Sequence, residues 1–187
     1  LRTDITPQIV SEVRARRIDL GIVEGELSAS EREQINVAPL QAFDQFVVVG
    51  RKHPWWGREH VSIDAIDGQS LITRQPHSQT RLWLEAVLLE HSVQPRIAAE
   101  FDHLESIKRA VTAGQCLTIL PSYTVEQEQQ LGLLHVIPID GSPLQRMLKL
   151  IWNPAAHLSP VARAFMTHLE TFFPGLGISA PTEPGAS

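Results

Sequence analysis

The chain has 187 residues, of which 43% are hydrophobic and 20% charged, and its 21 acidic and 16 basic residues give a net charge of −5. This composition predicts a globular protein with a buried core, and the acidic balance argues against direct nucleic-acid binding, which needs a basic surface. No apolar run is long enough to span a membrane, and the single cysteine, Cys116, excludes an internal disulfide and fits a reducing cytosol. The chain starts at Leu1 without methionine or a signal-peptide pattern, so we expect a fragment of a longer cytoplasmic protein.

The first fifty residues alternate extended and helical patterns. We expect a strand at 1–5, a helix from Thr6 to about Arg17, a strand at 18–23, a polar loop or single helical turn at 28–34, and strands at 35–40 and 43–49 joined by a short turn. Thr6 is a good N-cap residue, and Pro7 suits the first helical position. This order predicts a strand–helix–strand unit near the start of the chain.

The middle of the chain contains the clearest strand–helix–strand pattern. The loop at 52–57 contains Trp55 and Trp56, which we interpret as a lid on a domain edge. A strand is expected at 70–73, a helix capped by Ser78 running to about Glu90, a strand at 98–101, a helix capped by Asp102 and ended by a left-handed Gly114, and a strand at 117–120. A crossover helix between parallel strands begins at the carboxyl edge of the sheet, where α/β proteins bind ligands.

The last third of the chain returns to extended patterns before a final helix. We expect a short polar helix at 122–130 closed by Gly132, a strand at 133–139, a turn at 140–143, a strand at 144–152 and a helix opened by Ser159 and Pro160. Residues 177–187 are rich in Pro, Gly, Ser and Ala and are predicted to be a disordered tail. Two extended links around an α/β block are typical of two lobes that close on a ligand by a hinge motion.

Four stretches occur together in the order found in one protein family. They are Thr6 with Ile18-Asp19-Leu20-Gly21-Ile22-Val23-Glu24-Gly25; Phe46-Val47-Val48-Val49 with His53-Pro54; Leu71-Ile72-Thr73-Arg74 with Ser78, Thr80 and Arg81; and Glu105-Ser106-Ile107-Lys108-Arg109-Ala110-Val111 with Ala113-Gly114 and Leu120-Pro121. On these residues the chain resembles the effector-sensing domain of LysR-type transcriptional regulators. The Glu-Gly ending and the loop after Arg74 resemble the branch that includes regulators of carbon fixation and of sulfur and nitrogen metabolism.

The resemblance implies an α/β fold of two Rossmann-like lobes joined by two crossover strands, as in the type II periplasmic binding proteins. Lobe I would comprise residues 1–45 and 143–176, and lobe II residues 46–142. It also implies that lobe I is N-terminally truncated here, with one strand, one helix and a DNA-binding winged helix upstream of Leu1. The phosphate-binding surface would then belong to the absent part, in keeping with the net acidity.

A small anionic metabolite is expected to bind between the lobes. The candidate contacts are Thr6, Thr73, Arg74, Gln75, His103 and Leu104, which are placed by the resemblance and by their positions at helix starts and strand ends. Each has a simpler alternative: Thr6 as a plain cap, Arg74 in a surface salt bridge, and His103 as an ordinary helix-start residue. In the family, the helix that begins here at residues 103–104 commonly opens with a small polar pair. The pair His103-Leu104 therefore suggests a different effector preference.

Catalytic and metal chemistry find little support in the residues. Cys116 precedes an apolar strand with no base nearby, the histidines lack ligand spacing, no Gly-rich phosphate loop occurs, and no carboxylate pair suits acid–base work. We therefore expect no catalytic residue, metal or cofactor. We expect instead a ligand-sensing module that forms a homo-oligomer and acts on DNA only through the missing domain. The alternatives are a stand-alone solute-binding protein and an enzyme on the same scaffold.

Overall fold

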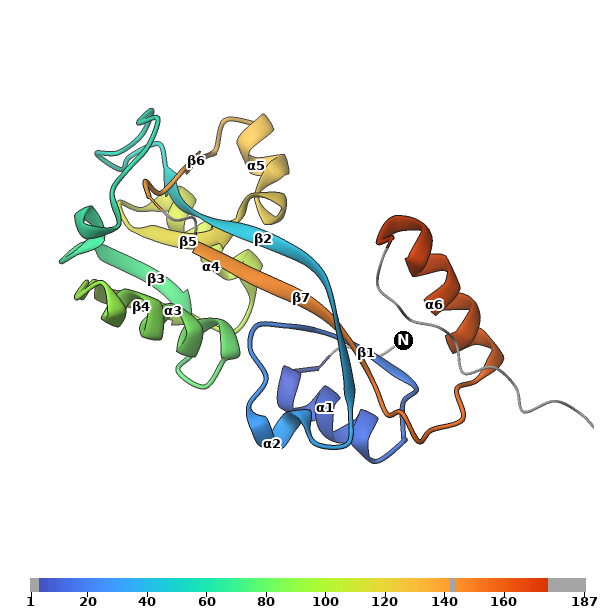
Figure 1. Ribbon diagram of the computed structural model, residues 1–187. Coiled ribbons are helices and arrows are strands. Elements are labelled where there is room, and N and C mark those ends of the chain that lie inside the picture. Colours follow the sequence, from blue (N-terminus) through green and yellow to red (C-terminus); the bar gives the residue numbers. More distant parts are fainter. Residues whose placement is uncertain (1–3, 142–143, 175–187) are drawn as a thin grey trace, which may run out of the picture. The chain divides into compact units, whose positions relative to one another are not determined.

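The computed structural model describes residues 4–141 and 144–174, which fall into two compact units (Figure 1). Among the described residues, the first unit takes in 4–42 and 147–174, and the second takes in 43–141 and 144–146. The unit boundaries fall inside two strands, β2 (Asn36–Gly50) and β7 (Leu144–Trp152), so the chain crosses from one unit to the other within extended segments. The functional lobe limits proposed from the resemblance stay a prediction, and the predicted tail at 177–187 lies outside the described residues.

The second unit contains a mixed sheet whose parallel strands lie at one end, with β4 (Arg96–Phe101) at the edge. Its strands β3 (Ser70–Arg74), β4 and β5 (Leu117–Pro121) are parallel, and β3 pairs with both of the others. Strand β2 pairs antiparallel with β5 and with β6 (Leu134–Ile137). The crossover helices α3 (Gln79–Glu90) and α4 (Leu104–Ala113) connect the parallel strands, so both helices begin near the carboxyl ends of β3 and β4.

Side-chain alternation divides the core of this unit between the two faces of the sheet. Val47, Leu71 and Leu117 pack with Leu84 and Leu88 of α3. Their strand neighbours Val48 and Ile72 pack instead with Ile107 and Val111 of α4. Because successive strand residues point to opposite faces, α3 covers one face of the sheet and α4 the other. The short elements η1 (Ile63–Ile66), η2 (Ser122–Thr124) and α5 (Glu126–Gln130) complete the unit.

The first unit joins the two ends of the chain. Strand β1 (Leu20–Glu24) pairs antiparallel with β7, so that Leu20 lies opposite Trp152. Leu150 packs with helix α6 (Pro160–Phe172), whereas Ile151 packs with Val10 and Val13 of helix α1 (Thr6–Arg14). One helix therefore covers each face of the β1–β7 pair. Of the two alternatives predicted for 28–34, a polar loop or a single helical turn, the structure has the helical turn, α2 (Ala29–Arg32), which Ser28 and Glu31 close with a complete capping box.

Several sequence predictions match the structure closely. The strand expected at 144–152 has those bounds. Ser78 caps α3 by accepting a hydrogen bond from the Arg81 amide at 3.1 Å, and Ser159 caps α6 through the Ala162 amide at 3.2 Å. Of the loop tryptophans, Trp55 is 6% exposed and joins the core, whereas Trp56 is 37% exposed. Local capping and turn rules therefore describe these segments well.

Other predictions about strand and helix ends were wrong. The strand predicted at 1–5 stays a prediction at residues 1–3, which lie outside the described residues, while Asp4 and Ile5 belong to no strand. The two strands at 35–40 and 43–49 are one continuous strand, β2, because Gln41 and Ala42 favour no turn. Gly114 is not left-handed, since its φ is −109°. A side chain at Gly114 would instead crowd the Ala110 carbonyl oxygen, at 3.2 Å from the added Cβ.

Candidate functional site

Five of the six predicted contact residues lie at one edge of the sheet in the second unit. In the β3–β4 register, Thr73 lies opposite Glu100 and Arg74 opposite Phe101, so both strands end at the same level. Gln75 follows β3 directly, and two residues after β4 the chain reaches His103, the N-cap of α4, and then Leu104. The structure thus brings Thr73, Arg74 and Gln75 to the sheet edge at which α4 begins. Their role as ligand contacts stays a prediction.

Arg74 presents a buried polar atom at this edge. Its side chain is partly buried, and its Nε is buried with no hydrogen-bond partner among the residues that the structure describes. Thr73 beside it is 4% exposed, while Gln75 is exposed. A buried N–H group that lacks an acceptor costs stability unless a ligand or water supplies one. The Arg74 guanidinium is therefore suited to bind an oxyanion at this edge, to which its N–H groups would donate.

The start of α4 adds backbone donors near the same edge. His103 has an extended backbone, its carbonyl accepts from the Ser106 and Ile107 amides, and its exposed side chain makes no capping hydrogen bond. The first amide groups of any helix have no partner within the helix, and the helix dipole makes that end favourable for an anion. An anion near Leu104 would meet these amides. The arrangement can bind a negative group, but it offers no nucleophile next to a base.

The predicted Asp102 cap was wrong, because α4 begins one residue later than expected. His103 takes the N-cap position, and Glu105 does not reach back to form a capping box. Its carboxylate instead contacts the Lys108 Nζ at 2.6 Å, one helical turn onward. Among the residues that the structure describes, no N-cap side chain accepts from the first-turn amides of α4, as a site for an external anion requires.

Two buried arginines beside this edge make internal contacts, although Arg81 Nη1, like Arg74 Nε, is buried without a hydrogen-bond partner among the described residues. Arg81, 6% exposed, contacts Glu85 at 2.6 Å and Glu100 at 3.4 Å. Arg146, 4% exposed, donates to the Thr80 hydroxyl at 2.9 Å and lies 5.4 Å from the centre of the Trp83 ring. No role was predicted for Arg146 from the sequence. Its one detectable signal was a charged residue inside a predicted, largely apolar strand, since a buried charge requires a polar partner.

Thr6, the sixth predicted contact, belongs to the first unit, and the prediction that it caps α1 was wrong. Ile5 is the N-cap residue and makes no side-chain capping bond, and Thr6 is the first residue of the helix. The Asp4 carboxylate accepts the Ile5 amide at 2.9 Å. Because Pro7 fits the first turn and has no N–H to satisfy, the helix can begin before it. Thr6 is partly buried, so its predicted ligand contact would use its hydroxyl or its first-turn amide.

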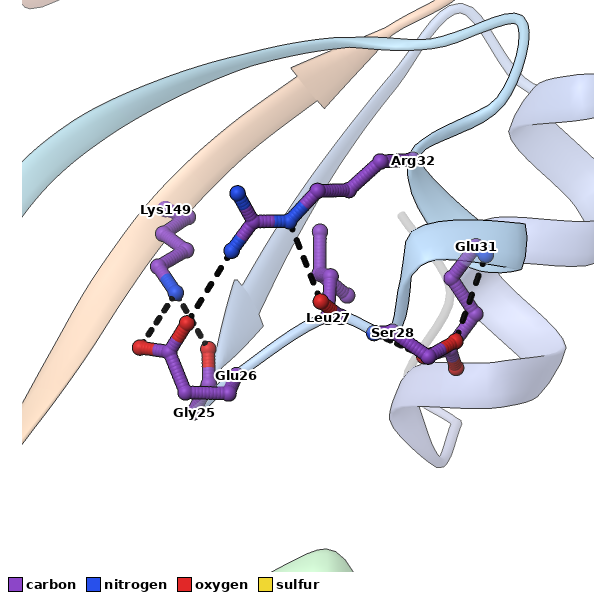
Figure 2. Close-up of polar contacts among 7 residues, drawn as sticks. All are labelled: Gly25, Glu26, Leu27, Ser28, Glu31, Arg32 and Lys149. Carbon is purple, nitrogen blue, oxygen red and sulfur yellow. Dashed lines mark hydrogen bonds and ion pairs between the residues drawn. The ribbon is translucent and has the colours of Figure 1, made fainter.

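A second polar cluster, absent from the sequence predictions, surrounds Lys149 in the first unit (Figure 2). Lys149 is 7% exposed, and its Nζ donates to the Gly25 carbonyl and to Glu26 Oε1, both at 2.8 Å. The other Glu26 oxygen, Oε2, lies 3.1 Å from an Arg32 guanidinium nitrogen. The hydrogen bond from Lys149 lowers the pKa of the Glu26 carboxyl below its ordinary value of 4.5. Lys149 lies between Leu148 and Leu150 in the strand at 144–152, and this charge among apolar neighbours was the signal that could have revealed the cluster.

The largest of the cavities described for the first unit has a different character. Its volume is about 760 Å³, and apolar side chains of β1 and α6, among them Leu20, Ile22, Val161 and Phe165, line much of it. None of the six predicted contacts lines this cavity. Ile22 is 42% and Val161 79% exposed, so the surface here is apolar and open. It does not resemble a site for a small anion.

Within residues 4–141 and 144–174, no group of three or more His, Cys, Asp or Glu side chains could hold a metal ion. No helix in those ranges is long and apolar enough to cross a bilayer.

Comparison with known proteins places this geometry in context. The family model described as the LysR substrate binding domain matches residues 1–174. A probable RuBisCO transcriptional regulator from Trichormus variabilis is 29% identical over 152 residues, covering 80% of this chain and 45% of that protein. The chain thus spans about half the length of the curated relatives it matches.

Solved structures agree with the family model. The regulatory domain of Synechocystis CcmR in complex with 2-PG has a TM-score of 0.81 and 25% identity, covering 94% of this chain and 83% of that one. The effector-binding domain of QuiR in complex with shikimate has a TM-score of 0.78 and 19% identity, covering 91% and 78%. These likenesses confirm the α/β fold class related to the type II periplasmic binding proteins.

Proposed function

The chain belongs to the LysR substrate-binding domain family, and from this premise we propose that it is the effector-sensing part of a LysR-type transcription regulator. Its curated relatives are transcriptional regulators, which supports this function over that of a stand-alone solute-binding protein. The chain would act on DNA through a separate winged helix-turn-helix domain, in the cytoplasm and as a homo-oligomer. Its own net charge of −5 fits a module that does not touch DNA itself.

The proposed effector is a small anion held at the carboxyl edge of β3 and the start of α4. The observation that supports this most directly is the buried Arg74 Nε without a hydrogen-bond partner in the described residues. A carboxylate or phosphate oxygen would satisfy it, and Thr73, Gln75 and the first-turn amides after His103 would supply further donors. Related domains were solved with 2-PG and with shikimate, which supports a small-molecule effector here. Thr6 is proposed as a further contact from the first unit.

We propose that this module performs no reaction of its own. The sheet edge offers a guanidinium, hydroxyl and amide donors, and backbone N–H groups, which bind and orient an anion. Binding would favour one conformation of the protein by its differential affinity, and that preference would be passed to the DNA-binding domain. Turnover of a bound compound in a sensitive product assay would contradict this part of the proposal.

The proposal can be tested with a panel of small carboxylates and phosphates. A ligand that binds only the folded chain raises its melting temperature, because it adds RT ln(1 + [L]/Kd) to the free energy of unfolding. For each compound that does so, Arg74→Ala should weaken binding by roughly tenfold or more, as expected for a charge-assisted hydrogen bond. Arg109→Ala is the matched control, because it removes the same charge from an exposed position on α4. Equal affinities of the wild type and Arg74→Ala for every compound would exclude the proposed site.

A further inference from the structure

The cluster around Lys149 has the geometry of an anion site that is already filled. One Glu26 carboxylate lies between the Lys149 ammonium, at 2.8 Å, and the Arg32 guanidinium, at 3.1 Å (Figure 2). Paired cations of this kind are how proteins commonly hold a carboxylate or phosphate. The occupant here is a side chain of the protein itself.

The backbone holds both cations independently of Glu26. The Lys149 Nζ donates to the Gly25 carbonyl at 2.8 Å, and the Arg32 Nε donates to the Leu27 carbonyl at 3.0 Å. Gly25 is in turn fixed to β7, since its amide donates to the Met147 carbonyl at 3.0 Å. The cations would therefore stay in place if the Glu26 carboxylate left. Such preorganisation lowers the cost of binding a replacement anion.

The two side chains of the Lys149–Glu26 ion pair differ strongly in burial. The Lys149 side chain is 9% exposed, whereas the Glu26 side chain is 73% exposed. A buried ammonium needs a counter-charge, because an unpaired buried charge is strongly destabilising. An exposed carboxylate loses little free energy when it leaves its ion pair and turns into water. Lys149 is therefore the fixed member of the pair and Glu26 the exchangeable one.

Lys108, the other buried lysine among the described residues, has a carboxylate partner that cannot exchange. The Lys108 Nζ lies 2.6 Å from Glu105, 2.7 Å from Glu128 and 3.3 Å from the Thr124 carbonyl oxygen. The Glu128 side chain is only 18% exposed, so this carboxylate cannot turn into water without moving α5. Lys108 thus has two internal carboxylates, and one of them, Glu128, is held in place.

We propose that Lys149 and Arg32 form an anion-binding site that Glu26 fills in the free protein, and that a small carboxylate or phosphate displaces Glu26 from it. The incoming oxyanion would keep Lys149 paired, so the exchange leaves no buried charge without a partner. It would also release the Glu26 side chain and so alter the segment between β1 and α2. This site uses residues of the first unit only and does not depend on the Arg74 site.

Inorganic phosphate is the probe for this exchange. In the intact chain with ¹⁵N-labelled lysine, the Lys149 ammonium signal, assigned by its loss in Lys149→Met, should move with phosphate concentration and saturate. Glu26→Gln removes the internal competitor and should tighten phosphate binding by roughly fivefold, the size of one exposed ion pair. Glu33→Gln is the matched control, because it removes the same charge from an exposed position one residue after α2. Its phosphate affinity should stay within about twofold of the wild type.

The outcomes separate this proposal from the Arg74 site. In phosphate titrations followed by isothermal titration calorimetry, Lys149→Met should lose the saturable binding, and Arg74→Ala should retain it. Two results would show that the cluster is only an internal ion pair. One is equal phosphate affinity of Glu26→Gln and Glu33→Gln, and the other is a wild-type Lys149 signal that shows no saturation. If Glu26→Gln does not fold, the wild-type titration of the Lys149 signal decides alone.

Discussion

The second unit is built from one continuous stretch of chain, whereas the first is assembled from two ends of it. In the second, β3, α3, β4, α4 and β5 follow one another. In the first, β1 pairs with β7, and Lys149 donates to Gly25, which is 124 positions away in the sequence. Local sequence patterns therefore describe the candidate site of the second unit well, while the polar cluster of the first becomes visible only in the folded chain.

The two units also differ in how tightly the backbone of a neighbour approaches a glycine. A Cβ added at Gly50 of the second unit would overlap the Val111 carbonyl oxygen, which is backbone and cannot move aside. A Cβ added at Gly21 of the first unit would meet the Ile9 Cγ2 at 2.6 Å and the Ile151 Cγ1 at 2.9 Å, which are side-chain atoms. Side chains can change rotamer, whereas a packed backbone resists displacement.

The largest expected effect follows from this difference. Gly50→Ala should lower the free energy of unfolding by about 3 kcal/mol or more, and Gly21→Ala by about 1 kcal/mol, because overpacking costs more where the obstacle is backbone. Urea denaturation followed by circular dichroism measures both values. If both variants lost the same free energy of unfolding, strand β2 and helix α4 would be able to move apart as easily as side chains repack, which would contradict this account.

The buried lysines provide the next test of the comparison. Lys108→Met leaves the Glu128 carboxylate, 18% exposed, without its cation, and should cost about 3 kcal/mol of stability. Lys149→Met leaves Glu26, 73% exposed, free to enter water, and should change stability by less than about 1 kcal/mol. Thermal and urea denaturation of both variants give the two numbers. A large loss in Lys149→Met alone would contradict the view that Glu26 is the exchangeable partner.

Acidification should expose a smaller difference, centred on His53 of the second unit. Burial, together with the nearby Arg58 charge, lowers the pKa of His53 below its ordinary value of 6.5, and its Nδ1 accepts the Trp55 amide at 3.1 Å. The unfolded chain therefore takes up a proton first as the pH falls through 6.5. Stability is complete above that pH and decreases below it until the folded-state pKa is reached.

His53→Asn should reduce this loss, because the Asn carbonyl can accept the Trp55 amide without titrating. The matched control is His157→Asn in the first unit, where the histidine is exposed and should contribute little. The measurement is the urea midpoint at a series of pH values between neutral and mildly acidic. An unchanged pH profile in His53→Asn would assign the loss to other groups.

Much of the fold could be predicted from local patterns, and the errors have identifiable causes. Ser78 and Ser159 were recognised as caps because a hydroxyl directly precedes a helical pattern. The Asp102 cap failed because Glu105 pairs with Lys108 rather than with the backbone, and Lys108 is held in turn by Glu128, 20 positions onward. A capping rule that considers four residues cannot include that partner.

The candidate site was predictable to a similar degree. The positions of Thr73, Arg74 and Gln75 at a sheet edge followed from the strand–loop–helix pattern, and the structure places α4 there as well. The burial of the Arg74 Nε could not be foreseen, because it depends on side chains brought together by the sheet. The Lys149 cluster was missed for the same reason, although a lysine between Leu148 and Leu150 in an apolar strand signals a buried charge that needs a partner.

The most direct test of the central claim is the Arg74 side chain itself during titration with an anion that stabilises the chain. In an ¹⁵N-labelled sample, the Arg74 Nε–H signal should shift and saturate together with the first-turn amides of α4, at Leu104 and Glu105, because the anion accepts from both. A ligand that saturates the chain while the Arg74 Nε–H signal stays unchanged would contradict the proposed effector site.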